Sequence, residues 1–442
     1  MVFSGRFPIL RGRRHWHSPL TALINRWIED KQIQPPIRDD TGPDLVKNIL
    51  RYIVNCRITS FFAVIVFVLQ SAISPGYTQE IKEIPADVYI ALDYIFSLSD
   101  SQDSFDPDKV KDLVDFVDVA EGGSHASLQT RNGADGAFFT FDINGELSDI
   151  LNYTYHPDIP PYVTMPSSLQ NHEWLTQEIK DDLRNLVSDY KQTSDIRLLR
   201  GSESEVITPD THTGGYYAYT QDRLLALMPG AAGPVLISAT IQSEPSVVGK
   251  KGCVAGDDKD WNYLYSRETG INKKGLSWVD SYMYFAYSVI IYVSNSSTKT
   301  INTGNFKWLN AGWAKINMVK SHHILKGMKR FAADFKDVLE SPNLPEASIL
   351  ADKYQELAQM SEQELRQQVA PYLQGLKSSG DLKSCPDSFT SLVSSGEYLQ
   401  QMSSQEMIRI LMLDYLKEFV AASSRDSAGS LSLKREALPP RS

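Results

Sequence analysis

The spacing of apolar residues changes along the chain, and each change predicts a different kind of element. Residues 86–98 have apolar positions at helical spacing, and Pro107 fits the first turn of a second helix that ends near residue 120. Residues 137–143 alternate like a strand and are followed by an Asn-Gly pair that is typical of a hairpin turn. The Gly-, Ser- and Asn-rich residues 121–136 predict a loop.

The middle of the chain has the texture of a β-sheet. Ser167 and Ser168 fit the cap of a helix that reaches about residue 190, and from there to about residue 306 aromatic and β-branched residues predominate. Four strands are predicted in this part, over residues 216–227, 234–242, 278–293 and 299–306.

The period becomes helical after the last predicted strand. Apolar residues recur every three or four positions from Trp308 to about Glu340, which predicts one long amphipathic helix. Residues 345–422 also have a helical pattern and contain two capping boxes, which begin at Ser361 and Ser403.

This order of elements predicts an α+β fold, in which a central antiparallel sheet grips a long amphipathic helix and extra helical segments lie at both ends. Six segments are expected along the chain. They are a basic, disordered N-terminal segment (1–57), a signal peptide or membrane anchor (58–76), an N-terminal helical and hairpin extension (77–165), an α+β domain (166–341), a C-terminal helical region (342–422) and a disordered tail (423–442).

Composition excludes several classes of protein. The chain has 442 residues, of which 42% are hydrophobic and 22% charged, as in folded globular proteins and unlike disordered or collagen-like chains. A net charge of -10 excludes general binding to nucleic-acid phosphates. Three cysteines are too few for a disulfide-dense scaffold.

The uneven distribution of charge predicts export. Residues 1–57 hold ten Lys or Arg against five Asp or Glu, whereas residues 58–79 carry no charge. The largely apolar residues 58–73 would make about 24 Å of helix, short of a bilayer core of about 30 Å. The basic flank and the small residues that follow favour a cleaved secretory signal, which leads to the periplasm. An uncleaved anchor in the inner membrane, with the rest of the chain facing the periplasm, is the alternative, and a buried core helix is a third.

A signal in this position lies 57 residues after Met1. We therefore expect Met1 not to be the true start of the protein. Val46, read from an alternative bacterial start codon, would give a compact basic region before the apolar run.

The sequence contains none of the common catalytic motifs, such as a P-loop, a Gly-x-Ser-x-Gly elbow or a His-Glu-x-x-His pair. The best candidates for acid–base chemistry are Asp210 and His212, which lie two positions apart before a predicted strand, although an ordinary polar turn explains them as well. Asp257, Asp258 and Asp260 offer oxygen ligands that suit Ca²⁺, but without the spacing of an EF-hand they also fit a solvated turn. No cofactor is expected.

Two cysteines, Cys253 and Cys385, lie after the predicted signal. In an oxidising compartment they could form one long-range disulfide.

Aromatic residues are dense between residues 216 and 313. Tyrosine and tryptophan combine apolar area with a polar tip, as the lining of a binding cavity requires, although an ordinary sheet core also favours them. The candidate ligand-binding residues are Tyr282, Tyr284, Trp308 and Trp313.

Residues 165–340 resemble the helix-grip fold, and START-type lipid-transfer domains in particular. The resemblance is carried by strand 281–293, a turn, strand 299–306 and the residues from Trp308 to Trp313 that open the predicted helix. It implies a curved sheet around a hydrophobic cavity and a role in binding rather than catalysis. The helices at 84–120 and after 342 are foreign to a minimal START-type domain.

We therefore expect an exported envelope protein that binds a hydrophobic or lipid-like small molecule without catalysis, and that binds no nucleic acid. It would meet the membrane only through residues 58–73, if these are not cleaved. One alternative is a structural or interaction protein of the cell envelope that docks partners through helices at 345–422. The other is a periplasmic hydrolase that uses Asp210 and His212.

Overall fold

The computed structural model describes residues 79–99, 103–190, 195–210, 214–273 and 276–426. The predicted signal or anchor at 58–76 and the basic segment before it lie outside the described residues, as does most of the predicted tail. The described residues all belong to one compact unit. None of the helices in the described part of the chain combines the length and the apolar character that a membrane crossing requires.

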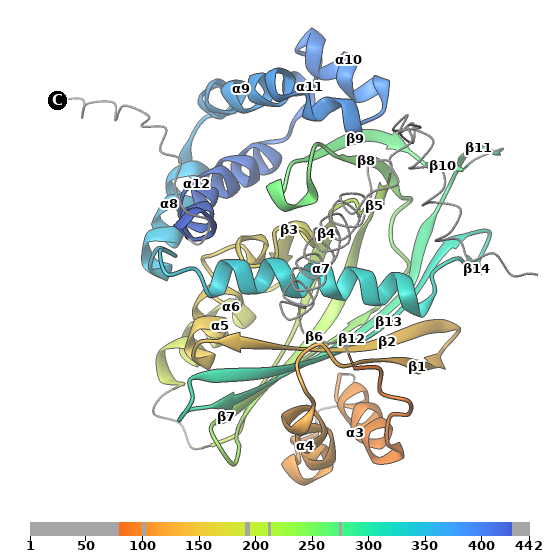
Figure 1. The fold of residues 1–442 in the computed structure, drawn as a ribbon, viewed down its shortest axis with the longest axis vertical. Helices are drawn as coiled ribbons and strands as arrows, with labels where there is room; N and C mark the ends of the chain where they lie inside the picture. Colours follow the sequence, from red (N-terminus) through yellow and green to blue (C-terminus); the bar gives the residue numbers. More distant parts are fainter. Residues whose placement is uncertain (1–78, 100–102, 191–194, 211–213, 274–275, 427–442) are drawn as a thin grey trace, which may run out of the picture. The chain divides into compact units, whose positions relative to one another are not determined.

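One large antiparallel sheet organises the fold, and the predicted α+β class is confirmed (Figure 1). Its strands follow the order β1-β2-β13-β12-β7-β6-β4-β3, and β14 pairs with the end of β13. Their bounds are β1 His125–Arg131, β2 Ala134–Asn144, β3 Leu169–Trp174, β4 Arg197–Ile207, β6 Ala218–Pro229, β7 Pro234–Gln242, β12 Tyr282–Asn295, β13 Thr300–Trp313 and β14 Ile316–Asn317.

The N-terminal hairpin lies at a different turn from the one predicted. The loop expected at 121–136 instead contains β1 and the start of β2, which are joined at Asn132 and Gly133. Both turn residues have positive φ angles, 48° and 74°, as a tight two-residue hairpin requires. Because β2 also pairs with β13 inside the sheet, the described residues of the predicted N-terminal extension contribute a strand to the interior of the main sheet.

One face of the sheet is covered by the two predicted N-terminal helices, α3 (Ala86–Ser97) and α4 (Lys111–Val119) (Figure 1). A short 3₁₀ turn precedes α4 and has Pro107 at its start, as expected. Buried residues of α3 and α4 share a core with alternate residues of the central strands, among them Phe138 and Phe306. This face of the sheet is apolar.

Three helices pack on the opposite face: α5 (Leu147–Tyr153), α6 (Gln177–Asp189) and α7 (Ser321–Leu339). The helix predicted from Ser167 to residue 190 is wrong in its first part, because β3 occupies residues 169–174 and the helix begins at Gln177. Gly201 of β4 lets α6 approach the sheet, since a Cβ there would lie 2.7 Å from a side-chain atom of Ile179.

The long helix predicted to begin at Trp308 begins instead at Ser321. Residues 308–313 continue β13, and the chain turns back at Ala314 and Lys315, which both have positive φ angles. The error has a physical reason: a spacing of four residues, as from Trp308 to Gly312, fits both a strand period of two and a helical period of 3.6.

The C-terminal region is helical, as predicted, and packs against a small sheet (Figure 1). Both capping boxes form, with reciprocal hydrogen bonds between Ser361 and Glu364 and between Ser403 and Glu406. The helices are α8 Ala347–Gln359, α9 Glu362–Ser379, α10 Asp387–Ser395, α11 Glu397–Gln401 and α12 Ser404–Asp426, and the additional strands are β5 Gly215–Tyr216, β8 Lys250–Val254, β9 Tyr263–Thr269, β10 Ile271–Lys273 and β11 Leu276–Val279.

Candidate functional site

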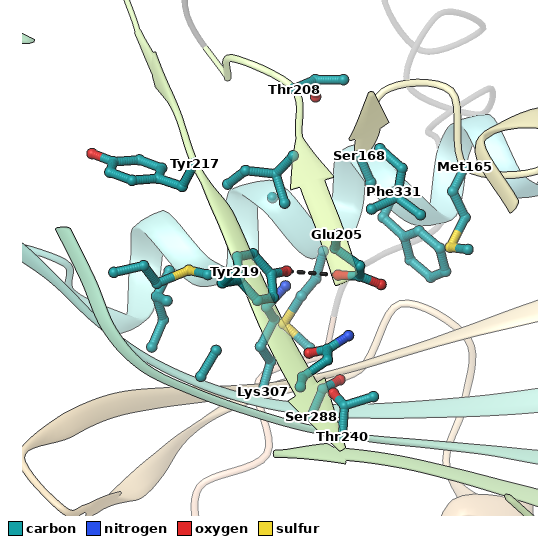
Figure 2. A pocket seen from close by; sticks show the side chains of 18 of the residues that line it. Met165, Ser168, Glu205, Thr208, Tyr217, Tyr219, Thr240, Ser288, Lys307 and Phe331 are labelled. Carbon is teal, nitrogen blue, oxygen red and sulfur yellow. Dashed lines mark hydrogen bonds between the residues drawn. The ribbon is translucent and has the colours of Figure 1, made fainter. Parts of the chain in front are cut away.

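A cavity of about 660 Å³ lies between the main sheet and helix α7. Its volume falls within the range of about 300–1,000 Å³ that is typical of sites for small molecules. The strands β3, β4, β6, β7, β12 and β13 supply one side of its lining, and α7 supplies another. Figure 2 shows part of this lining, with α7 crossing behind the strands.

One wall of the cavity is apolar. It includes three residues of α7 that are spaced three or four positions apart, Ile324, Met328 and Phe331. Met283 and Leu309, from the neighbouring strands β12 and β13, add to it. This wall can therefore receive the hydrocarbon part of a ligand.

The facing strands place a buried ionic network in the cavity, centred on Glu203 of β4. Arg223 donates from Nε to Oε2 of Glu203 at 2.8 Å and from Nη2 to Oε1 at 2.5 Å. Gln221 Nε2 donates to Oε1 at 2.6 Å, and His172 Nε2 lies 2.9 Å from Oε2. Both oxygens of Glu203 are thus fully used, and the remaining Nη1 of Arg223 donates to Ser238 Oγ at 2.6 Å.

Glu203 and the nearby Glu205 differ in their electrostatic surroundings. Burial alone would raise the pKa of Glu203, but the charge of Arg223 and the hydrogen bonds from His172 and Arg223 lower that pKa to about 2. Glu205 accepts a hydrogen bond from Tyr219 Oη at 2.7 Å (Figure 2), and its closest atom lies 3.6 Å from Arg223. Burial and the charge of Glu203 raise the pKa of Glu205.

His172, Glu203 and Glu205 are close enough to be considered as metal ligands, because one ligand atom from each lies within 4.8 Å of the others. Arg223 already supplies a positive charge to both carboxylates. A divalent cation would have to displace the guanidinium and break the two hydrogen bonds that it donates to Glu203. The residues present therefore form an ionic network that does not suit a metal.

Lys307 of β13 also lines the cavity. Burial lowers the pKa of its amine, and the carboxylate of Glu205 opposes that effect. Lys307 thus carries a poorly solvated amine inside the cavity (Figure 2).

The candidate aromatic residues lie in different places. Trp313 lines the cavity, whereas Trp308 lies on the opposite face of the sheet, where it packs against Phe96 and donates its indole N–H to the backbone of the β1 strand. Tyr282 and Tyr284 lie at the start of β12 next to one another, and neither belongs to the cavity lining.

Asp210 lines the cavity, but His212 lies outside the described residues, so the structure does not place the pair. The three aspartates considered for Ca²⁺ differ in their surroundings. Asp257 accepts a hydrogen bond from the backbone of Lys259, and Asp258 forms an ion pair with Arg330. Burial raises the pKa of Asp260.

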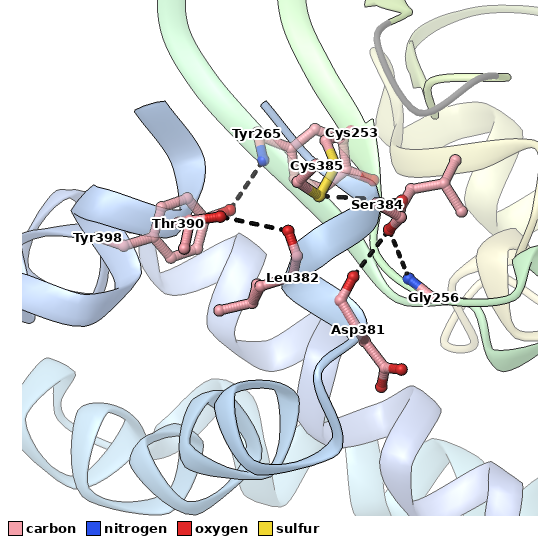
Figure 3. The surroundings of a disulfide bond; sticks show 10 residues. Cys253, Gly256, Tyr265, Asp381, Leu382, Ser384, Cys385, Thr390 and Tyr398 are labelled. Carbon is pink, nitrogen blue, oxygen red and sulfur yellow. Dashed lines mark hydrogen bonds between the residues drawn. A yellow bond between two sulfur atoms is a disulfide. The ribbon is translucent and has the colours of Figure 1, made fainter. Parts of the chain in front are cut away.

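Cys253 of β8 and Cys385, which follows α9, form a disulfide in the structure (Figure 3). Their Cα atoms are 5.7 Å apart, within the usual range for such a bridge. Ser384 donates to the carbonyl of Val254 and accepts from the N–H of Gly256, so hydrogen bonds accompany the covalent link. The disulfide joins the small sheet to the C-terminal helical region.

Sequence reasoning missed the central residues of the site, which are Glu203, Glu205, Arg223 and Lys307. A signal was present in β4, where the side chains of Glu203 and Glu205 alternate with those of Ser202 and Ser204, so that both faces of the strand are polar there. A strand with a polar inner face lacks the apolar alternation on which strand prediction depends.

The comparison with known proteins gives no family for this chain: no protein-family model matches the sequence, and no curated protein is detectably similar to it.

Proposed function

We propose that the protein binds a small amphipathic, lipid-like molecule in the cavity between the main sheet and α7, without catalysis. The observation that carries this proposal is the cavity itself, with its volume of about 660 Å³ and its wall of α7 side chains. Transfer of a hydrocarbon chain from water to that wall would supply most of the binding energy, at about 25 cal/mol per Å² of apolar surface removed from water.

We also propose that the sheet and α7 act together as a helix grip, as in START-type domains. Phe331 and Phe335 of α7 pack edge-on against Phe141 of β2, at centroid distances of 5.9 and 6.4 Å. Tyr292 of β12 stacks near Phe335 at 6.4 Å. These contacts pack the part of α7 around Phe331 and Phe335 against the sheet, while Ile324 and Met328 line the cavity.

The proposed site of action is the cell envelope, to which the apolar run at 58–73 would direct the chain. The disulfide between Cys253 and Cys385 is consistent with an oxidising compartment.

The interaction alternative has less support. Within residues 347–420, Ile349 is the one large apolar side chain that is exposed, at 47%. A single exposed side chain is ordinary for a surface and does not make a docking patch.

Two glycines offer a matched test of the binding proposal. Gly327 lies in α7 and lines the cavity, Gly375 lies in α9 away from it, and a Cβ at either position would meet nothing within 4 Å. Replacing either glycine inside a helix by phenylalanine should not destabilise the protein, because glycine is the poorer helix former. Only Gly327→Phe would place a ring at the cavity.

The measurement is the fluorescence of the neutral lipophilic dye N-phenyl-1-naphthylamine, titrated into the full chain. We expect saturable binding to the parent protein and to Gly375→Phe, and at least tenfold weaker binding to Gly327→Phe. Equal binding to the two variants, or no binding to the parent protein, would contradict the proposed function.

A further inference from the structure

Four neighbouring polar side chains in the cavity form no hydrogen bond or ion pair with any other described residue. The Oδ1 atom of Asn305 is buried and has no partner. Lys307 has only a longer-range electrostatic interaction, with Glu205. The four residues are Thr240, Ser288, Asn305 and Lys307.

The sheet register brings these four side chains together. Ser288 of β12 lies directly opposite Lys307 of β13 on one side and Thr240 of β7 on the other. Directly opposed residues in antiparallel strands have Cβ atoms about 4.5–5.5 Å apart. Asn305 precedes Lys307 by two positions and therefore points to the same face. Figure 2 shows Lys307, Ser288 and Thr240 close to one another on the strands that form the cavity floor.

This polar row differs from the network beside it. In that network Arg223 and Glu203 satisfy each other, and Gln221, Ser238 and His172 take up the remaining hydrogen-bonding capacity. In the row, one amine, two hydroxyls and one amide are left without partners. Asn305 Oδ1 is fully buried, and Ser288 and Lys307 are partly buried, so the row has hydrogen-bonding capacity that the described residues leave unused.

We propose that the polar row of Thr240, Ser288, Asn305 and Lys307 binds the carboxylate of an amphipathic ligand, whose hydrocarbon part lies along the α7 wall. This inference rests on the proposed function and adds the chemical class of the ligand, a fatty-acid-like monoanion.

The chemistry of the row suits a carboxylate. Lys307 offers three N–H donors and the two hydroxyls offer one each. The NH₂ group of Asn305 can also donate to a carboxylate, whereas its unpartnered Oδ1 is an acceptor and needs a donor such as the Lys307 ammonium. A carboxylate accepts at both oxygens and carries one charge, which matches the single cation of the row. A phosphate monoester would bring nearly two negative charges to the same single cation.

Glu205 is the negative charge nearest to Lys307, and when ionised it would repel a bound carboxylate. Its surroundings reduce this repulsion. Burial and the charge of Glu203 already raise its pKa, so a proton is more easily added to Glu205 than to an ordinary glutamate. A bound carboxylate near Lys307 would strengthen that tendency, while holding Lys307 in its charged form.

The test compares three probes with the same hydrocarbon chain, dodecanoate, 1-dodecanol and dodecyl phosphate, each titrated calorimetrically into the full chain at pH 7. Dodecanoate is expected to bind at least tenfold more tightly than dodecanol, because hydrogen bonds to a charged group are stronger than those to a neutral hydroxyl. It is also expected to bind more tightly than dodecyl phosphate.

Lys307→Met removes the charge but keeps the length of the side chain. It should weaken the binding of dodecanoate at least tenfold and leave the affinity for dodecanol unchanged or higher. The matched control is Lys326→Met on the exposed side of α7, which should change neither. Thr240→Val removes one hydrogen-bond donor at constant shape and should weaken the binding of dodecanoate by a smaller factor than Lys307→Met does. This variant provides a second measurement if Lys307→Met fails to fold.

The outcomes separate the two proposals. Equal affinity for dodecanoate and dodecanol, or dodecanoate affinity within twofold of the parent in Lys307→Met, would overturn the carboxylate assignment and leave the proposed function standing. Tighter binding of dodecyl phosphate would overturn it in favour of a phosphate headgroup. If none of the three probes binds, the proposed function itself fails.

Discussion

Replacing Glu203 by glutamine should destabilise the protein strongly, because Arg223 loses the carboxylate to which it donates hydrogen bonds and keeps only the more distant Glu205, at 3.6 Å, as a counter-charge. Arg223 donates two hydrogen bonds to the Glu203 carboxylate, whose side chain is fully buried. Glutamine has nearly the same shape, so the change removes the charge and leaves packing in place. Loss of one partner from a buried ion pair costs about 3–5 kcal/mol.

The pKa of Glu203 leads to a similar magnitude. It falls from an ordinary value of 4.5 to about 2 in the folded protein. At about 1.4 kcal/mol per pKa unit, ionised Glu203 stabilises the fold by about 3 kcal/mol. We therefore expect Glu203→Gln to lower the free energy of unfolding by about 3–4 kcal/mol.

The assay is equilibrium unfolding of the full chain in guanidinium chloride, with the denaturant slope checked for each variant. Glu173→Gln is the matched control, because Glu173 is exposed on the neighbouring strand β3. It should change the unfolding free energy by less than about 0.5 kcal/mol. The double variant Glu203→Gln/Arg223→Met, which removes both charges, should recover part of the loss. A loss below about 1 kcal/mol for Glu203→Gln would refute the reasoning that the network is buried and mutually dependent.

Three further predictions follow from the structure. Because the pKa of Glu203 is lower in the folded than in the unfolded protein, its carboxylate contributes fully to the free energy of unfolding above about pH 4.5, and this contribution is lost as the pH falls towards 2. Acid unfolding followed by circular dichroism should therefore show less pH dependence in this range for Glu203→Gln than for the parent protein. The disulfide closes a loop of 132 residues, so a Cys253→Ser/Cys385→Ser variant should lose up to about 5 kcal/mol of unfolding free energy, and an unchanged denaturation midpoint would contradict this. Trp308→Phe should lower the free energy of unfolding by about 1–3 kcal/mol, since it leaves the carbonyl of Gln129 without its donor. It should not alter dye binding, because Trp308 faces away from the cavity. Weaker dye binding at unchanged stability would contradict this prediction.

Local patterns were sufficient to predict much of the secondary structure. The helices α3 and α4, most of the central strands and the two capping boxes depend on neighbours within a few residues, which the sequence displays directly. The errors arose where two periods fit the same residues. Trp308 and Gly312 fit either a strand or a helix, and pairing with β2 and β12 decides for the strand.

The site was harder to predict because its residues are related only by the sheet register. Glu203 and Arg223 are 20 positions apart, and Lys307 is more than 80 positions from either. Cross-strand pairing joins Lys307 to Ser288 and Ser288 to Thr240, and no local pattern reveals such a row. The aromatic-rich residues 216–313 include strands that line the cavity. Aromatic density could not show that Trp313 faces the cavity and Trp308 the opposite core.

The central claim is that the cavity between the main sheet and α7 holds an amphipathic molecule. Native mass spectrometry of the full chain, purified without organic solvent, tests it most directly when the parent protein, Gly327→Phe and Gly375→Phe are compared. Our account predicts an excess mass, released by organic extraction, on the parent protein and on Gly375→Phe, and much less of it on Gly327→Phe. A bare polypeptide mass for the parent protein, or the same excess on all three, would contradict it.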